Sequence, residues 1–119
     1  WQALTYPWGV ASLTQQDPDF HPYHEHWNYY HKDAAYHNGT VWAWLLGHFA
    51  EGYLKLHGKA AKIFVEKIIK GFDGVMTQYG VGTVAEIYDG DAPHRPKGSV
   101  SQAWSVAELL RMMDLVKQI

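Results

Sequence analysis

The sequence predicts an all-α protein whose helices are joined by long loops. Apolar residues recur at helical spacing in three stretches, 40–58, 59–72 and 101–117. Residues 1–39 and 71–98, by contrast, are rich in glycine, proline and polar side chains. The connections of a self-contained helical bundle typically run about 2–8 residues. Loops as long as these are therefore more typical of part of a larger α/α toroid.

The segment before the first predicted helix, residues 1–39, is expected to be irregular. Prolines, glycines and asparagines interrupt it, and polar residues separate its apolar pairs. A loop of this length is uncommon in a compact domain and usually has a function. The chain begins with Trp1 rather than with methionine, so we expect a processed or truncated chain.

The first predicted helix begins at Thr40, a favourable N-cap residue, and ends at Gly58, a favourable C-terminal stop. Val41 and Trp44 add apolar surface on further faces, so neighbours are expected nearly all round this helix. The apolar residues at helical spacing are Trp42, Leu45, Leu46, Phe49, Tyr53 and Leu56.

The second predicted helix, residues 59–72, is amphipathic, with lysines and a glutamate on its outer face. The side chains expected to face inward are Ile63, Phe64, Ile68 and Phe72.

The last predicted helix, residues 101–117, has Ser99 or Ser101 available as its N-cap. It is apolar over most of its surface, which again indicates neighbours on several sides. The side chains expected to be mostly buried are Ala103, Trp104, Val106, Ala107, Leu110, Met113 and Leu115.

The composition indicates one soluble globular domain. Of the 119 residues 47% are hydrophobic, 15% are aromatic and 18% are charged, which excludes a disordered tail or a fibre. The net charge is −2, so we expect no nucleic-acid or membrane partner held by charge. There is no cysteine, which excludes disulfides, thiolate metal sites and a cysteine nucleophile. The longest apolar run, Val41–Leu46, is far shorter than the roughly 20 residues of a membrane-spanning helix.

The stretch from Thr83 to Pro96 has the densest set of reactive side chains. Three carboxylates, a histidine and an arginine lie within ten residues of one another. Glu86 lies between two apolar residues, so partial burial is expected to raise the pKa of its carboxyl group, as suits a general base. The alternative is a polar surface loop in which aspartates pair with Arg95.

A second candidate segment, Tyr36–Trp44, leads from a turn into the first predicted helix. A tryptophan offers a flat apolar face, while His37 and Asn38 offer donors and acceptors, and together they can hold a sugar ring. Trp42 and Trp44 are about 200° apart on a helix, so they cannot share one face. The alternative is that these tryptophans are core residues.

Five of the eight histidines lie within residues 21–37. The group that suggests a metal site comprises Asp19, His21, His24, Glu25 and His26. Its spacing matches neither a His-Glu-x-x-His helix nor a zinc site with cysteine. We therefore expect a polar, partly exposed loop and no metal.

Three segments, Tyr36–Leu45, Glu86–Gly98 and Gln102–Glu108, resemble the amylo-α-1,6-glucosidase domain of glycogen debranching enzymes. Pro7–Val10 and Leu13–Thr14 are similar to the same family, in the same order along the chain. The resemblance implies an (α/α)6 toroid, of which residues 1–119 would be the C-terminal portion and not the whole.

The resemblance also implies roles for individual residues. In this family and the related glucoamylases and trehalases, a Glu followed by an aromatic residue and an Asp supplies the general base, and Glu86-Ile87-Tyr88-Asp89 matches that pattern. The paired acid, an aspartate of an earlier loop, has no counterpart in this chain. At three positions this chain differs from the residues that are common in the family: Asn38, Ala43 and Ser99. The expected substrate-binding residues are His37, Asn38, Trp42, Tyr88, Asp89, Arg95 and Trp104.

The expected function is therefore that of the C-terminal part of an inverting glycoside hydrolase, which releases glucose from α-1,6 branch points of glycogen-like glucans. We expect a cytoplasmic location, no cofactor, and a branched α-glucan or oligosaccharide as the ligand. The remainder of the toroid, or a second copy of the chain, is expected to cover the apolar surfaces. One alternative is a non-catalytic glucan-binding or interaction domain derived from the family. Another is a metal-dependent hydrolase that uses the histidine cluster.

Overall fold

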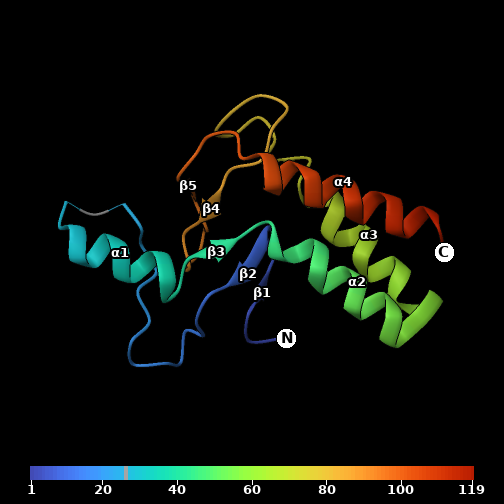
Figure 1. The fold of residues 1–119 in the computed structure, drawn as a ribbon, viewed down its shortest axis with the longest axis horizontal. Coiled ribbons are helices and arrows are strands. Elements are labelled where there is room, and N and C mark those ends of the chain that lie inside the picture. Colours follow the sequence, from blue (N-terminus) through green and yellow to red (C-terminus); the bar gives the residue numbers. More distant parts are fainter. Residues whose placement is uncertain (26) are drawn as a thin grey trace.

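A computed structural model describes residues 1–25 and 27–119. Short strands lie at the centre, with one helix on one side and three on the other (Figure 1). The elements in chain order are β1 (Thr5–Tyr6), β2 (Gly9–Ala11), α1 (Tyr29–His37), β3 (Val41–Trp42), α2 (Leu45–His57), the 3₁₀ turn η1 (Gly58–Ala61), α3 (Lys62–Lys70), β4 (Ile87–Tyr88), β5 (Pro96–Lys97) and α4 (Ala103–Lys117). Within the described ranges no helix is long and apolar enough to cross a membrane.

The prediction of an all-α fold is wrong. The chain contains a five-stranded sheet with the order β1-β2-β3-β4-β5, in which each neighbouring pair is antiparallel, and only 42% of the chain is helical. The strands are two or three residues long. An alternation of apolar and polar residues becomes detectable over about 4–8 residues, so strands this short leave no periodic signal.

The sheet brings together segments that are far apart in the sequence. Trp42 of β3 is the register partner of Val10 in β2 and of Ile87 in β4, and Ile87 is in turn paired with Lys97 of β5. The glutamate directly before β4 therefore lies beside the strand that leads into α2.

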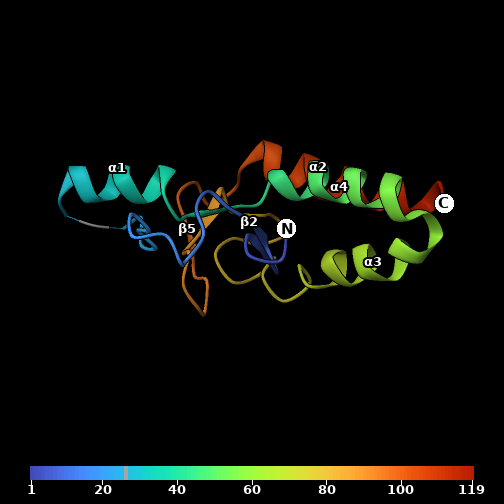
Figure 2. The ribbon, with the colours of Figure 1, turned by 90° about the horizontal axis from the view of Figure 1, so that it is seen from below.

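Helix α1 lies in the stretch predicted to be irregular. The side chain of Asn28 caps it by accepting a hydrogen bond from the backbone N–H of Tyr30 at 2.9 Å. Ala35 is the one residue of α1 that is buried, so the helix has no apolar stripe from which to predict it. It projects from the sheet, away from the other helices (Figures 1 and 2).

Helix α2 begins at Leu45 and not at Thr40. Val41 and Trp42 belong to a strand, because both of their neighbouring strands take their backbone hydrogen bonds. The predicted end of the helix is confirmed: Gly58 follows α2 with a φ of 57°, a conformation that favours glycine.

The inner face predicted for the helix at residues 59–72 is confirmed only in part. Ile68 and Phe72 are buried, but Ile63 is 78% exposed. The buried residues of α3 are Val65 and Ile68. Ile63 is about 200° round the helix from Val65, so it lies on the opposite, exposed face.

Helix α4 begins at Ala103, with Gln102 as its N-cap in place of Ser99 or Ser101. Its predicted buried face is also wrong. Val106 and Leu115 are only partly buried, and the other five residues are exposed: Ala103, Trp104, Ala107, Leu110 and Met113. Its buried apolar residues are Leu109, Met112 and Val116.

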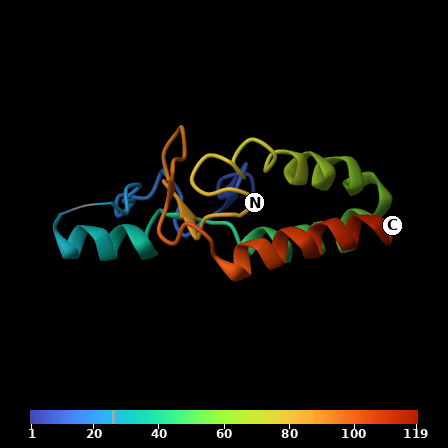
Figure 3. The ribbon, with the colours of Figure 1, turned by 90° about the horizontal axis from the view of Figure 1, so that it is seen from above.

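The three C-terminal helices form two layers. Helices α2 and α4 run side by side, and α3 packs against them in a second layer (Figures 2 and 3). Arg111 of α4 links the two helices of the first layer. It forms ion pairs with Glu51 of α2 and with Glu108 of its own helix. The shared core includes Leu46, Ala50, Leu54, Val65, Ile68, Phe72, Leu109, Met112 and Val116.

Candidate active site around Glu86

Both oxygens of the Glu86 carboxylate accept hydrogen bonds. The Tyr36 hydroxyl donates to Oε1, and the backbone N–H of Ser99 donates to Oε2 at 2.9 Å. The backbone N–H of Glu86 donates in return to the Ser99 carbonyl oxygen at 3.0 Å. Glu86 is thus fixed between the end of α1 and the segment that follows β5.

The pKa of Glu86 is lowered, opposite to the sequence-based expectation. Partial burial does raise this pKa, but the hydrogen bonds from Tyr36 and Ser99 outweigh it, and His24 adds a smaller lowering effect. Burial and the hydrogen bond to Glu86 raise the pKa of Tyr36 to about 12. At neutral pH the pair therefore consists of a carboxylate and a protonated hydroxyl.

Aromatic side chains lie next to this pair. The ring of Tyr36 meets that of Trp42 nearly edge-on, with centroids 4.6 Å apart, and Trp42 in turn lies 6.4 Å from Trp104. We call Tyr36, Trp42 and Trp104 the aromatic wall. Its members come from three elements that are separate in the sequence: α1, β3 and the first turn of α4.

An ionised, oriented carboxylate beside aromatic faces has two chemical uses. It can accept a proton from water or from a ligand hydroxyl, and the rings can pack against the apolar C–H face of a sugar. Beside Trp42 and Trp104 the surface is hollowed by about 260 Å³, with an apolar lining. The site therefore fits a neutral, hydroxyl-rich ring better than a charged ligand.

The sequence matches the family described as amylo-alpha-1,6-glucosidase over residues 1–111. The chain belongs to the amylo-alpha-1,6-glucosidase family. Neither the comparison with curated proteins nor the comparison with solved structures gave a match. The expected relation to glycogen debranching enzymes is thus confirmed at the level of the family.

Two of the binding residues expected for this glucosidase-family chain, Trp42 and Trp104, belong to the aromatic wall, whose third member Tyr36 binds Glu86. Within the described residues, the other five make no hydrogen bond to the Glu86 carboxylate. Tyr88 is buried in the core, where its ring lies 5.5 Å from that of Trp8. Burial raises the pKa of Tyr88 to about 12.

Asp89 is also buried, and its Oδ1 has no hydrogen-bond partner among the described residues. Burial raises the pKa of its carboxyl group, and the positive charges of Lys97 and Arg95 offset part of that rise. The side chain of Arg95 is exposed and forms no ion pair in the described structure, so the paired loop that we considered as an alternative does not form.

His37 and Asn38 end helix α1. The His37 side chain is exposed, and its Nε2 lies 3.7 Å from Asp33, one turn earlier. Asn38 is the C-cap residue, and its carbonyl oxygen accepts a hydrogen bond from the His21 N–H at 2.7 Å. Asn38 therefore ties the end of α1 to the segment before it, whereas the His37 side chain pairs within its own helix.

Nothing in the sequence pattern links Tyr36, Ser99 or His24 to Glu86. Tyr36 is the first residue of a segment that resembles the family, and this was the one sequence feature that pointed to it. Because no helix was predicted at Tyr36, the sequence did not indicate which way its side chain points. Ser99 acts through its backbone N–H, which no side-chain pattern reveals. His24 packs against Tyr36 with centroids 4.9 Å apart. Burial, aided by Lys32, lowers the pKa of His24.

The histidine cluster is dispersed in the structure. Among the described residues, no group of three His, Cys, Asp or Glu side chains could hold a metal ion. His26, a member of the predicted cluster, lies outside the described residues. The His21 ring bonds to the Asp19 carbonyl oxygen at 2.6 Å, and His24 faces Tyr36.

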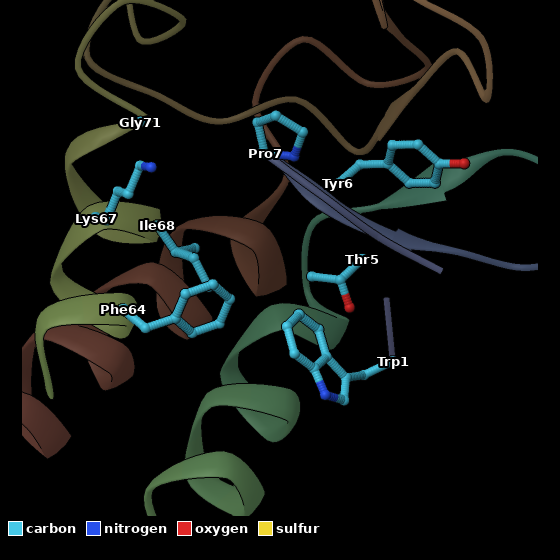
Figure 4. Close-up of a pocket in the computed structure, with 8 residues that line it drawn as sticks. All are labelled: Trp1, Thr5, Tyr6, Pro7, Phe64, Lys67, Ile68 and Gly71. Carbon is cyan, nitrogen blue, oxygen red and sulfur yellow. The ribbon is translucent and has the colours of Figure 1, made fainter. Parts of the chain in front are cut away.

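A separate hollow of about 350 Å³ lies between α3 and the first strand. Phe64, Lys67 and Ile68 of α3 face Trp1 and β1 across it (Figure 4). The lining is mostly apolar; its polar side-chain groups include the Lys67 ammonium and the hydroxyls of Thr5 and Tyr6, and it contains no carboxylate. It shares no residue with the aromatic wall and cannot supply the acid–base chemistry of a hydrolase.

Proposed function

We propose that this chain carries the general base of an inverting glucosidase, with Glu86 as that base. The substrate would be a branched α-glucan whose α-1,6-linked glucose is released. One observation supports this assignment above the others: the Glu86 carboxylate is held by two donors, Tyr36 and Ser99, and is ionised at neutral pH. Membership of the glucosidase family supports it independently.

The proposed reaction needs a base that is ready to accept a proton. Each carboxylate oxygen has two acceptor positions, so Glu86 can bind Tyr36 and Ser99 and still accept a hydrogen bond from a water molecule. When that water attacks the anomeric carbon, its proton passes to Glu86. A general acid on the opposite face protonates the departing glycosidic oxygen, about 6.5–9.5 Å from the base.

The acid is proposed to come from outside these 119 residues. Glu86 cannot fill that role, because an acid must be protonated before the reaction and the pKa of Glu86 is lowered. The aromatic wall would hold the glucose ring while water approaches from the side of Glu86.

The test is glucose release from a branched maltooligosaccharide by the full-length polypeptide that contains this chain, with the anomer identified by NMR. Inversion predicts β-glucose as the first product. Release of α-glucose would contradict the assignment of Glu86 as a base. Oligosaccharide binding without any release would instead support the alternative function, a glucan-binding domain without catalysis.

A further inference from the structure

Tyr79 binds the peptide group that holds one oxygen of Glu86. Its hydroxyl donates a hydrogen bond to the carbonyl oxygen of Gly98 at 3.0 Å. The same peptide group carries the N–H of Ser99, which donates to Oε2 of Glu86 at 2.9 Å. A peptide group is planar and rigid, so the two hydrogen bonds lie at opposite ends of one unit. Through this unit Tyr79 is linked to the carboxylate.

The loop that carries Tyr79, between α3 and β4, runs beside the segment that leads from β5 into α4 (Figure 1). The hydroxyls of Thr83 and Ser101 share a hydrogen bond of 2.6 Å between the two segments. A Cβ at Gly80 would lie only 2.8 Å from Cγ1 of Val100, so the loop packs closely there. These contacts do not involve the Tyr79 hydroxyl, and its removal should leave the loop in place.

Gly98 gives the backbone freedom at the point where Tyr79 binds it. Its φ is 70°, in the left-handed region that glycine enters readily. A Cβ there would lie 2.7 Å from Oε2 of Glu86, so glycine also lets the backbone come close to the carboxylate. Because glycine restricts the neighbouring peptide group little, the hydrogen bond from Tyr79 restrains the direction in which the Ser99 N–H points.

The bond from Tyr79 also affects how strongly that N–H donates. Hydrogen bonds in a chain polarise one another, so a donor on the Gly98 carbonyl makes the Ser99 N–H a stronger donor. Burial raises the pKa of Glu86, and the hydrogen bonds from Tyr36 and Ser99 lower it. A weaker bond from Ser99 would therefore raise this pKa.

We propose that Tyr79 is a positioning residue for Glu86 and acts through the peptide group that joins them. This inference rests on the proposed function, because it takes Glu86 to be the base. Each oxygen of the carboxylate is then controlled by one tyrosine: Tyr36 donates directly to Oε1, and Tyr79 strengthens the backbone donor to Oε2.

The test is Tyr79→Phe in the full-length polypeptide, which removes the hydroxyl and keeps the ring. The first readout is the pH titration of the Glu86 carboxyl carbon by NMR, with its signal assigned by its absence from Glu86→Gln. We expect the pKa of Glu86 to rise toward its ordinary value, by less than in Tyr36→Phe, because Tyr79 acts through a peptide group. Tyr23→Phe, which removes a hydroxyl that binds the exposed Asp91, should leave the titration unchanged.

The second readout is the pH dependence of kcat with a branched oligosaccharide. A base works only when it is ionised, so the acidic limb of the profile should move to higher pH. At neutral pH kcat should fall by about threefold, while KM changes by less than about twofold. In the Glu86→Gln background, Tyr79→Phe should cause no further loss, because the group on which it acts is gone.

An unchanged titration of Glu86 in Tyr79→Phe would overturn the positioning role, and so would an equal fall in kcat with and without the Glu86 carboxylate. A shifted titration with an unchanged kcat profile would instead leave the positioning role intact and overturn the proposed function, because the group that titrates would not be the base.

Discussion

The hydroxyl group of Tyr36 donates a hydrogen bond to the carboxylate of Glu86, 50 positions later in the sequence. The bond links the last turn of α1 to the residue before β4. It keeps the carboxylate ionised and fixes one of its oxygens, and both effects suit a group that must accept a proton. Since α1 is otherwise poorly packed, with Ala35 its one buried residue, Tyr36 also helps to hold this helix at the sheet.

Tyr36→Phe removes the donor and should raise the pKa of Glu86 toward its ordinary value. A base is active only when ionised, so activity should be lost at a higher pH on the acidic side of the profile. We also expect kcat to fall by about tenfold, the effect of losing a hydrogen bond to a charged group. The measurement is kcat against pH for the full-length polypeptide.

Tyr23→Phe is the matched control for this change. The Tyr23 hydroxyl also donates to a carboxylate, that of Asp91, at 3.0 Å, but at an exposed position outside the site. It should leave the pH profile unchanged. If both variants give the wild-type profile, Tyr36 does not tune Glu86.

Trp42→Ala should weaken the binding of glucose by about 1–3 kcal/mol, because it removes the central ring of the aromatic wall. The backbone pairing of Trp42 with Val10 and Ile87 does not need the indole, so the fold should persist. Calorimetry measures the affinity, and circular dichroism checks the fold. Unchanged affinity in a folded variant would make Trp42 a packing residue only.

The part of the fold that could be predicted from the sequence is the part in which apolar residues recur at helical spacing over several turns. The C-terminal helices, the stop at Gly58 and the burial of Ile68 and Phe72 follow from apolar spacing and glycine conformation. The sheet could not be predicted, because two-residue strands such as Ile87–Tyr88 have no alternation to detect. Helix α1 was missed since it buries one residue and shows no apolar stripe.

The candidate site was predictable only in its local parts. Glu86, Trp42 and Trp104 lie in segments that resemble the family, and the resemblance indicates them as site residues. Their partners depend on contacts between distant segments, such as Tyr36 with Glu86. The direction of the Glu86 pKa was wrong for the same reason: burial can be anticipated from apolar neighbours in sequence, but the donors that outweigh it come from elsewhere in the fold.

Two glycines of α2 offer a test of how α2 packs against α4. A Cβ at position 47 would clash with Oε2 of Glu108, whereas a Cβ at Gly52 would meet nothing within 4 Å. Gly47→Ala should force the Glu108 side chain away from Arg111, which it binds at 2.9 Å, and destabilise the protein by about 1–3 kcal/mol. Gly52→Ala should stabilise it by up to about 1 kcal/mol, because alanine favours a helix. Urea unfolding measures the free energy of unfolding of both variants. Equal changes in that free energy would contradict the close contact between Gly47 of α2 and Glu108 of α4.

The 119-residue chain alone is expected to self-associate and to release no glucose. Leu56 and Ile63 are 81% and 78% exposed, and Leu110 and Met113 are exposed on α4. Apolar surface of this kind usually marks a missing neighbour, and we propose that the chain is one part of a larger folded unit. Sedimentation measures the association, and Leu110→Lys should reduce it if the α4 face takes part. A stable monomer at high concentration would contradict the prediction.

The most direct test of the central claim is the steady-state rate of Glu86→Gln in the full-length polypeptide, with a branched oligosaccharide as substrate. Glutamine keeps the shape of the side chain but cannot accept the proton of the attacking water. The account predicts that kcat falls by at least about 10²-fold while KM changes little. A kcat close to that of the wild type would show that Glu86 is not the base.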